Sequence, residues 1–214
     1  MSTQKAVIVT EPKTAGLVGS RAIPKLPDDY ILVKTVSVGL NPTDWRYIDF
    51  LSPPGVLLGS DYSGVVEAVG KDVKLPWKKG GRICGSTHGG NAVQAEDGAF
   101  ASDKALSTEG GEYLSILPAK IDRANVNNRF ILFYTSLGEA FNFGDMPFPA
   151  KPEDFEHAKK FTQVAQDLLD QGNIKVHPPR VGKDGLRGVL EGIELLRTNK
   201  VSGEKLVYNV EETP

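Results

Sequence analysis

The sequence predicts an α+β fold in which a small β-barrel is followed by two isolated strands and then by helices. Three observations support this prediction. Short β-branched runs, separated by proline, glycine and aspartate, occupy the first 100 residues. Two continuous apolar runs follow Gly111. The last third repeats its apolar residues at spacings of three and four, which is the period of a helix.

The N-terminal strands are predicted from composition and punctuation. Runs containing β-branched residues occupy residues 5–10, 30–40, 62–69 and 81–85. Proline, glycine and aspartate separate these runs. Short strands at this spacing are typical of a small barrel.

The middle of the chain predicts two further strands, at residues 112–117 and 129–135. Both runs are apolar without alternation, which is expected when the two faces of a strand are buried. The shortage of other strand-like segments nearby means that these two strands lack most of a sheet.

Two helices and a closing strand complete the predicted fold. Proline at position 152 and the acids after it open a helix that we assign to residues 152–171. Gly172 ends it. Leucine, isoleucine and valine at helical spacing predict a second helix at residues 184–199. The last strand is expected at residues 204–210.

Composition and charge exclude several classes of function. The formal net charge is −2, from 25 basic and 27 acidic residues, and no basic run is interleaved with aromatic residues, so we expect no nucleic-acid partner. No apolar run approaches the roughly 18 residues of a membrane helix, and the start of the sequence lacks a secretory signal pattern. We therefore expect no membrane association and a cytoplasmic location. The single cysteine, Cys84, excludes an intrachain disulfide.

Motifs for nucleotides and metals are missing from the sequence. No two glycines are spaced i, i+2, so a G-x-G-x-x-G turn does not occur, and no Gly-Lys pair precedes serine or threonine as in a P-loop. Gly182, Gly185 and Gly188 imitate a phosphate-binding turn, but prolines precede them, and we interpret them as a helix-entry loop. The three histidines are widely separated, and we expect no metal and no cofactor.

Polar and aromatic side chains gather at the ends of two predicted strands. One group follows the strand at residues 30–40, and the other precedes the strand at residues 62–69. Their members are Asn41, Thr43, Asp44, Trp45, Arg46, Ser60, Asp61 and Tyr62.

At these residues the chain resembles the medium-chain dehydrogenase/reductase superfamily. The resemblance is closest to its zinc-free quinone-reductase and fungal trans-acting enoyl-reductase branches. The segments that carry it are VGLNPTDWRY (38–47), LLGSDYSGVVEAVG (57–70), DGAF (97–100), LSTEGGEYLSIL (106–117) and SGEKLVY (202–208). They occur in the order of the family.

The resemblance implies a GroES-like β-barrel catalytic domain and a nucleotide-binding domain of which most is missing. In the family, a complete parallel sheet with its NADP site follows the segment DGAF, whereas here the chain passes within a few residues to the last strands of that sheet. We therefore expect three parts: a first barrel part at residues 1–101, a short remnant of the Rossmann sheet at residues 102–136, and a C-terminal helical part returning to the barrel at residues 137–214.

The resemblance also bears on metal and assembly. Zinc-dependent relatives carry a cysteine ligand where this chain has Asn41, and histidine and glutamate where it has Ser60 and Asp61, so zinc chemistry is not expected. Loss of most of a sheet would uncover apolar faces. We expect the remnant strands to cover those faces in a homodimer and to represent a natural short form.

Three functions remain open from the sequence. The first is an enzyme without NADPH that isomerises or cyclises a polyketide-type unsaturated substrate without net redox change, with cycloaddition as one form of cyclisation. The second is an enoyl or quinone reductase whose NADPH site is unconventional or supplied by a partner. The third is a non-catalytic accessory protein of a synthase.

The first hypothesis assigns roles to particular side chains. Asp44 and Asp61 are the candidate proton-transfer bases, and Arg46 and His88 are candidate donors to a substrate carbonyl. The simpler interpretations are a turn cap for Asp44, a solvated side chain for Arg46 and core packing for the aromatic residues. The expected substrate-binding residues are Asn41, Thr43, Trp45, Tyr47, Phe50, Tyr62, Phe141 and Phe143.

Overall fold

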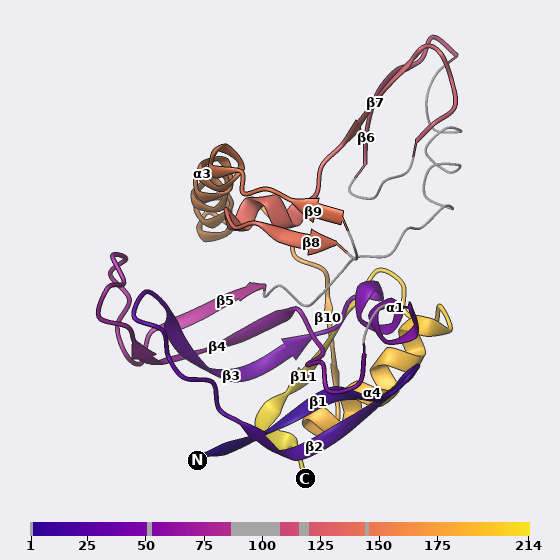
Figure 1. The fold of residues 1–214 in the computed structure, drawn as a ribbon. Helices are drawn as coiled ribbons and strands as arrows, with labels where there is room; N and C mark the ends of the chain where they lie inside the picture. The colour runs from indigo at the N-terminus through magenta and orange to yellow at the C-terminus, as the bar shows by residue number, and fades with distance from the viewer. Residues whose placement is uncertain (1, 51–52, 87–107, 116–119, 144–145) are drawn as a thin grey trace. The chain divides into compact units, whose positions relative to one another are not determined.

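The computed structural model describes residues 2–50, 53–86, 108–115, 120–143 and 146–214 (Figure 1). Its chain divides into two compact units. The terminal unit comprises Met1–Gly90 and His177–Pro214, and the middle unit comprises Asn91–Val176. His88 lies outside the described residues. The expected boundaries near residues 101 and 136 stay predictions.

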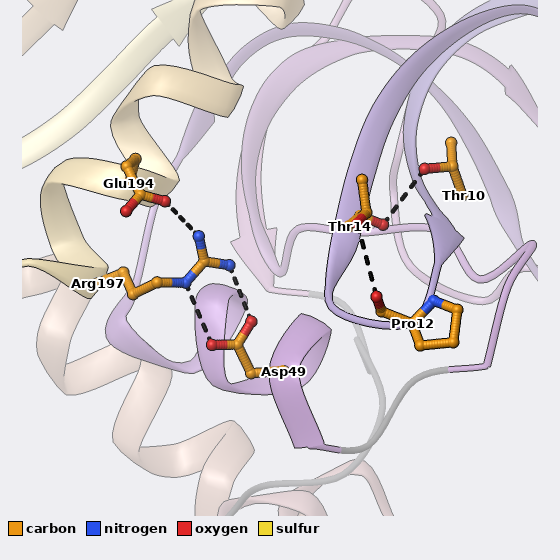
Figure 2. Close-up of polar contacts among 6 residues, drawn as sticks. All are labelled: Thr10, Pro12, Thr14, Asp49, Glu194 and Arg197. Carbon is orange, nitrogen blue, oxygen red and sulfur yellow. Dashed lines mark hydrogen bonds and ion pairs between the residues drawn. The ribbon is translucent and has the colours of Figure 1, made fainter.

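The terminal unit contains a hairpin and a five-stranded sheet (Figure 1). The hairpin joins β1 (Thr3–Glu11) to β2 (Thr14–Ala22) in antiparallel register. Its turn is tightened by Thr10 Oγ1, which donates to Thr14 O at 3.4 Å, and by Thr14 Oγ1, which donates to Pro12 O at 3.5 Å (Figure 2).

The five-stranded sheet has the order β10-β11-β3-β4-β5. Its strands are β3 (Ile31–Gly39), β4 (Asp61–Val69), β5 (Arg82–Ser86), β10 (Pro179–Gly182) and β11 (Lys205–Asn209). The pairs are antiparallel except β10 with β11. A single bridge between Ile8 and Leu57 links β1 to the loop before β4. Among the described residues the two sheets do not close into one hydrogen-bonded barrel.

Two helices cover this unit, α1 (Pro42–Phe50) and α4 (Gly185–Arg197). Helix α4 contacts α1, β1, β2 and β11, and Figure 1 shows it alongside the hairpin. Its apolar face is buried, as helical spacing predicted. The shared core consists of Val7, Val9, Leu40, Ile48, Leu186, Val189, Ile193, Leu206 and Tyr208.

The glycines before and within α4 allow Tyr208 to pack closely. A Cβ added at Gly182 would lie 2.1 Å from Tyr208 Cε1, and one at Gly192 would lie 2.4 Å from Tyr208 Oη. Both distances are far below van der Waals contact. Packing of the Tyr208 ring therefore explains the glycines at positions 182 and 192, whereas Gly185 lies against Thr213.

The middle unit is built from two small sheets and a helix. Strands β6 (Gly111–Ser115) and β7 (Val126–Phe130) pair in parallel, and β8 (Phe141–Phe143) pairs with β9 (Met146–Phe148). Helix α3 (Pro152–Asp170) packs against the 3₁₀ turn η1 (Phe133–Leu137).

The two strands after Gly111 differ from the sequence expectation. The predicted strand at residues 129–135 is instead the end of β7 followed by η1. In the single chain Leu114 and Phe130 are 58% and 44% exposed, and the expectation that a homodimer covers the faces of these strands stays a prediction. Among the described strands, β6 and β7 pair only with each other.

Most other elements confirm the predicted fold. Both long helices lie within two residues of their expected ends, and the strands at the start of the chain and at residues 204–210 are present. The sequence analysis missed β2, α1, β8, β9 and β10. The α+β class is confirmed, and the GroES-like expectation is taken up with the comparisons below.

Candidate active site

Three polar side chains meet where β3, β4 and β11 come together. Lys205 Nζ donates to Asp61 Oδ2 at 2.6 Å and to Asn41 Oδ1 at 2.5 Å. Asn41 Nδ2 also donates to Asp61 Oδ2, at 2.8 Å. The side chains of Lys205 and Asp61 are 31% and 37% exposed, so this cluster is accessible from solvent. We call these three residues the Asn-Asp-Lys cluster.

The sheet brings this cluster together through Gly39. Gly39 is paired with Asp61 on one side and with Val207 on the other. A Cβ at position 39 would lie 2.8 Å from Lys205 Cε and 3.5 Å from Asp61 Cβ. The absence of a side chain on the central strand therefore lets Lys205 cross β3 and reach Asp61 on β4.

Asn41 is held by the start of α1, where Asp44 performs the capping. Asp44 Oδ2 accepts a hydrogen bond from the backbone N–H of Asn41 at 2.7 Å. This is the reciprocal contact of a capping box, in which an acid at the third helical position accepts from the backbone N–H of the N-cap residue. Pro42 at the first helical position favours the same helix start. The cap interpretation of Asp44 therefore agrees with the structure.

Asp44 is also unusual electrostatically, because it is a carboxylate only 4% exposed. Burial raises its pKa from 3.8 to about 6, and the negative charge of Asp61 acts in the same direction. The hydrogen bond from Asn41 and the charge of Lys205 oppose that rise in pKa. Asp44 is thus poised to exchange a proton near neutral pH, but its solvent exposure is small.

An ion pair fixes α1 on α4 (Figure 2). Arg197 donates from Nη2 to Asp49 Oδ1 at 2.8 Å and from Nε to Asp49 Oδ2 at 3.2 Å. Arg197 also pairs with Glu194 on its own helix. The two-pronged contact with Asp49 constrains the direction of α1 and so the position of Asn41 at its start.

The aromatic residues of α1 serve mainly in packing. Trp45 packs against the core, and its ring lies 6.3 Å from that of Phe50. Arg46 lies over the Trp45 ring, with its Cζ 5.3 Å from the ring centroid. Phe50 is 62% exposed, and Tyr47 is half-buried.

The other expected site residues are dispersed. Thr43 is exposed on the first turn of α1. Tyr62 follows Asp61 in β4, and burial together with the nearby Cys84 raises the pKa of its hydroxyl. Phe141 lies in the middle unit, where its ring stacks on Phe148 with centroids 5.1 Å apart. Phe143 belongs to β8, and its side chain lies outside the described residues.

The structure thus joins Asn41 and Asp61 and places Asp44 directly behind Asn41. It adds Lys205, which the sequence analysis did not select. A lysine at the first position of an otherwise apolar strand, in the segment EKLVYNV, was the available signal. Only the register of β11 on β3 reveals that it reaches Asp61.

The family resemblance of the sequence implies NADPH, which would bind at a glycine turn before a helix. The turn between β10 and α4 has the expected position, but the Tyr208 ring fills the space at Gly182, and the N–H of Leu186 already donates to Thr213 Oγ1 at 2.9 Å. Gly110 precedes β6, whereas dinucleotides bind at the carboxyl ends of parallel strands. The described residues therefore do not fit a dinucleotide.

Comparison with known families and sequences identifies related proteins. The family described as alcohol dehydrogenase GroES-like domain matches residues 27–118. The trans-enoyl reductase TOXD of Cochliobolus carbonum is 62% identical over 101 residues, which are 47% of this chain and 34% of that protein. The chain thus spans about a third of the length of this relative.

A second relative aligns over its whole length. The trans-enoyl reductase resD of Aspergillus sclerotiorum is 24% identical over 356 positions, covering 96% of this chain and 100% of that protein. Since 96% of 214 residues is about 205, about 150 of the 356 positions face a gap in this chain. The unmatched positions lie inside the alignment.

Solved structures agree on the fold. A human synaptic vesicle membrane protein VAT-1 homolog-like protein matches over 100% of both chains with a TM-score of 0.66 at 14% identity. The quinone oxidoreductase from Coxiella burnetii matches over 98% of this chain and 100% of its own with a TM-score of 0.53 at 15% identity. Among the described helices, none combines the length and hydropathy that a membrane-spanning segment requires.

Proposed function

We propose that this chain belongs to the enoyl-reductase branch of the medium-chain dehydrogenase/reductase superfamily, that it keeps the substrate cleft and that it has lost the hydride chemistry. The proposed reaction is a redox-neutral isomerisation or cyclisation of a polyketide-type unsaturated substrate in secondary metabolism. The Asn-Asp-Lys cluster is the observation that carries this proposal.

The cluster has the two groups that an allylic proton shift needs. A carboxylate removes a proton from the carbon next to a carbonyl, and a fixed cation stabilises the enolate oxygen that forms. Lys205 carries three N–H groups, of which two bind Asp61 and Asn41. The third is assigned to the substrate carbonyl.

The proton shift balances without a cofactor. Asp61 takes a proton from the α carbon of a β,γ-unsaturated acyl group, and the C–H electrons pass into a dienolate. Both donors in the cluster bind Asp61 Oδ2, so Oδ1 is assigned to the proton transfer. Asp61 is 37% exposed, so its protonated carboxyl exchanges with solvent before it delivers a proton to the γ carbon, which restores the carbonyl and leaves an α,β-unsaturated product.

Two sequence findings support the absence of hydride transfer. The chain has no G-x-G-x-x-G turn. The alignment with a full-length trans-enoyl reductase has 356 positions, and this chain supplies about 205 residues to it. About 150 positions of that relative therefore have no counterpart in this chain. The Asn-Asp-Lys cluster is compatible with that loss, since Asn41, Asp61 and Lys205 all belong to the terminal unit.

The second candidate is enoyl reduction with NADPH held at an unconventional site or by a partner. The identity of 62% with a trans-enoyl reductase over 101 residues favours it. In that case Lys205 would still polarise the substrate carbonyl, but the hydride would come from NADPH and the product would be saturated.

The test uses the full chain and a β,γ-unsaturated acyl thioester in D₂O, with and without NADPH. Proton shift predicts an α,β-unsaturated product with deuterium at the γ carbon and no dependence on NADPH. Lys205→Met and Asp61→Asn should each lower the rate at least about a hundredfold. Lys79→Met is the matched control, because Lys79 pairs with Glu67 on the exposed face of the same sheet.

A saturated product that forms only with NADPH would replace the proposed reaction with the second candidate. No turnover of any unsaturated thioester, with or without NADPH, would favour the accessory-protein alternative. Equal rates for Lys205→Met, Asp61→Asn and wild type would remove the Asn-Asp-Lys cluster from the mechanism.

A further inference from the structure

Helix α3 is amphipathic but has no buried residue along its 19 positions. Phe161 and Val164 are 65% and 54% exposed, and Leu168 continues the same stripe at a spacing of four. An apolar stripe of this kind normally faces a core. We call Phe161, Val164 and Leu168 the α3 stripe.

The stripe is separate from the side of α3 that packs on η1. Phe155 makes that contact, since a Cβ at Gly138 would lie 3.1 Å from Phe155 Cβ. Phe155 is six residues from Phe161 and nine from Val164, so it lies on a different face of the helix. Contacts with η1 therefore do not explain the apolar character of the stripe.

Charges along one edge of the stripe are arranged to match a second copy. Lys160 and Asp167 lie four residues before and three residues after Val164, on the same side. Gln163 Nε2 donates to Asp167 Oδ1 at 2.9 Å and holds that carboxylate on this edge. An edge with a cation toward one end and an anion toward the other is complementary to itself when reversed.

We propose that α3 is the interface of a homodimer in which two copies pack antiparallel about Val164. Phe161 then packs on Leu168 of the partner subunit, and Val164 meets Val164 of the partner subunit. Lys160 faces Asp167 of the partner subunit, and the symmetry makes this ion pair twice. A parallel two-fold arrangement would set this charged edge against the edge of the partner helix that carries Phe161 and Leu168, leaving the charges without opposite partners, which disfavours it.

This interface is distinct from the remnant strands at residues 102–136 that the sequence analysis expected to pair. The proposed interface and the Asn-Asp-Lys cluster also belong to different units, since α3 is part of the middle unit and the cluster is part of the terminal unit. Failure of the proposed reaction would therefore leave the dimer proposal unaffected, and the reverse also holds.

The test measures the mass of the full chain by sedimentation across a wide concentration range. Wild type should form a dimer, and Val164→Asp should remain a monomer. Lys160→Glu and Asp167→Lys should each raise the dissociation constant at least about tenfold, because each sets like charges together. Asp170→Lys, a charge reversal on the same helix away from the stripe, is the matched control and should dimerise normally.

Mixing the two charge variants gives a test that misfolding cannot imitate. A Lys160→Glu chain and an Asp167→Lys chain restore both ion pairs in a heterodimer, so their equimolar mixture should recover the dimer mass. Wild type that is monomeric at every concentration would overturn the proposal. So would a dimer that Val164→Asp leaves intact, or charge variants that do not recover on mixing.

Discussion

The two units of this chain differ most in how they bury apolar side chains. The terminal unit places Val9, Val66 and Leu206 almost wholly out of water, and both its helices add residues to one core. In the described part of the middle unit, the buried apolar side chains are Ile121 and Val126. Hydrophobic burial dominates folding free energy, so the terminal unit carries the stability of the chain.

The difference shows how few apolar side chains a two-stranded parallel sheet buries. Parallel strands are stable when both faces are covered, yet β6 and β7 pair only with each other among the described strands. The terminal unit, in contrast, has a sheet, a hairpin and two helices around a common core. The active-site proposal rests on the terminal unit, and the dimer proposal rests on the middle unit, in whose described residues few apolar side chains are buried.

Leu206→Ala should break the terminal unit and have the largest effect. Leu206 is 2% exposed, and truncation of such a side chain lowers the free energy of unfolding by about 2–5 kcal/mol. Leu114→Ala in the middle unit removes the same atoms from a side chain 58% exposed and should cost less than about 0.5 kcal/mol. Urea denaturation measures both. Equal losses would refute the contrast between the units.

Asp44→Asn should change how the free energy of unfolding of the terminal unit depends on pH. The pKa of Asp44 is raised from 3.8 to about 6, so the folded chain binds this proton more tightly than the unfolded chain. The resulting stabilisation is complete below about pH 3.8 and is lost as the pH rises through about 6. Wild type should therefore lose about 2 kcal/mol relative to Asp44→Asn between pH 4.5 and 7.5.

Urea denaturation of both proteins at the two pH values gives this difference directly. Asn keeps an oxygen that can accept the Asn41 N–H, so the helix cap is preserved in the variant. A difference that does not change with pH would mean that Asp44 is not buried as a carboxylate.

Arg197→Met should have a smaller effect on stability, confined to the terminal unit. Arg197 and Asp49 are 28% and 17% exposed, so their paired hydrogen bonds are only partly screened by solvent. The expected loss is about 1 kcal/mol. Arg180→Met, whose partner Glu204 lies 3.9 Å away on the surface, is the control and should change little. Urea denaturation distinguishes them, and equal effects would contradict the role of Arg197.

Gly39→Ala should displace Lys205 from Asp61 and should change the free energy of unfolding least among these variants. Its Cβ would displace Lys205 Cε, which is flexible, so the unfolding free energy should change by less than about 1 kcal/mol. The rate of deuterium incorporation should fall about tenfold, because Lys205 no longer reaches Asp61. Gly19→Ala on β2, where nothing lies within 4 Å of the new Cβ, is the control. An unchanged rate in Gly39→Ala would show that the Lys205 position is unimportant.

Particular residues show how far the sequence could predict the fold. Helix α3 was predictable because Pro152 and the acids after it open a long apolar period. Helix α1 was missed because Asn41-Pro42-Thr43-Asp44 also reads as a turn. Strand β10 was missed because Pro179 suggested a loop, but β10 is at the edge of its sheet, where proline is tolerated.

The candidate site was only partly predictable for a physical reason. Asn41 and Asp61 lie at strand ends and could be selected from sequence, whereas Lys205 reaches them only through the register of β11 on β3 and the open space at Gly39. Tertiary register of that kind has no local signal. The contrast between the well-packed terminal unit and a middle unit with few buried apolar side chains among its described residues likewise depends on tertiary contacts.

The central claim is that the chain works without hydride transfer, and NADPH titration of the purified full chain tests it most directly. Enhancement and blue shift of nicotinamide fluorescence would report binding, followed by competition with excess NADP. The account predicts no binding at millimolar NADPH. Saturable binding at micromolar NADPH would contradict it and would favour the second candidate function, enoyl reduction with NADPH.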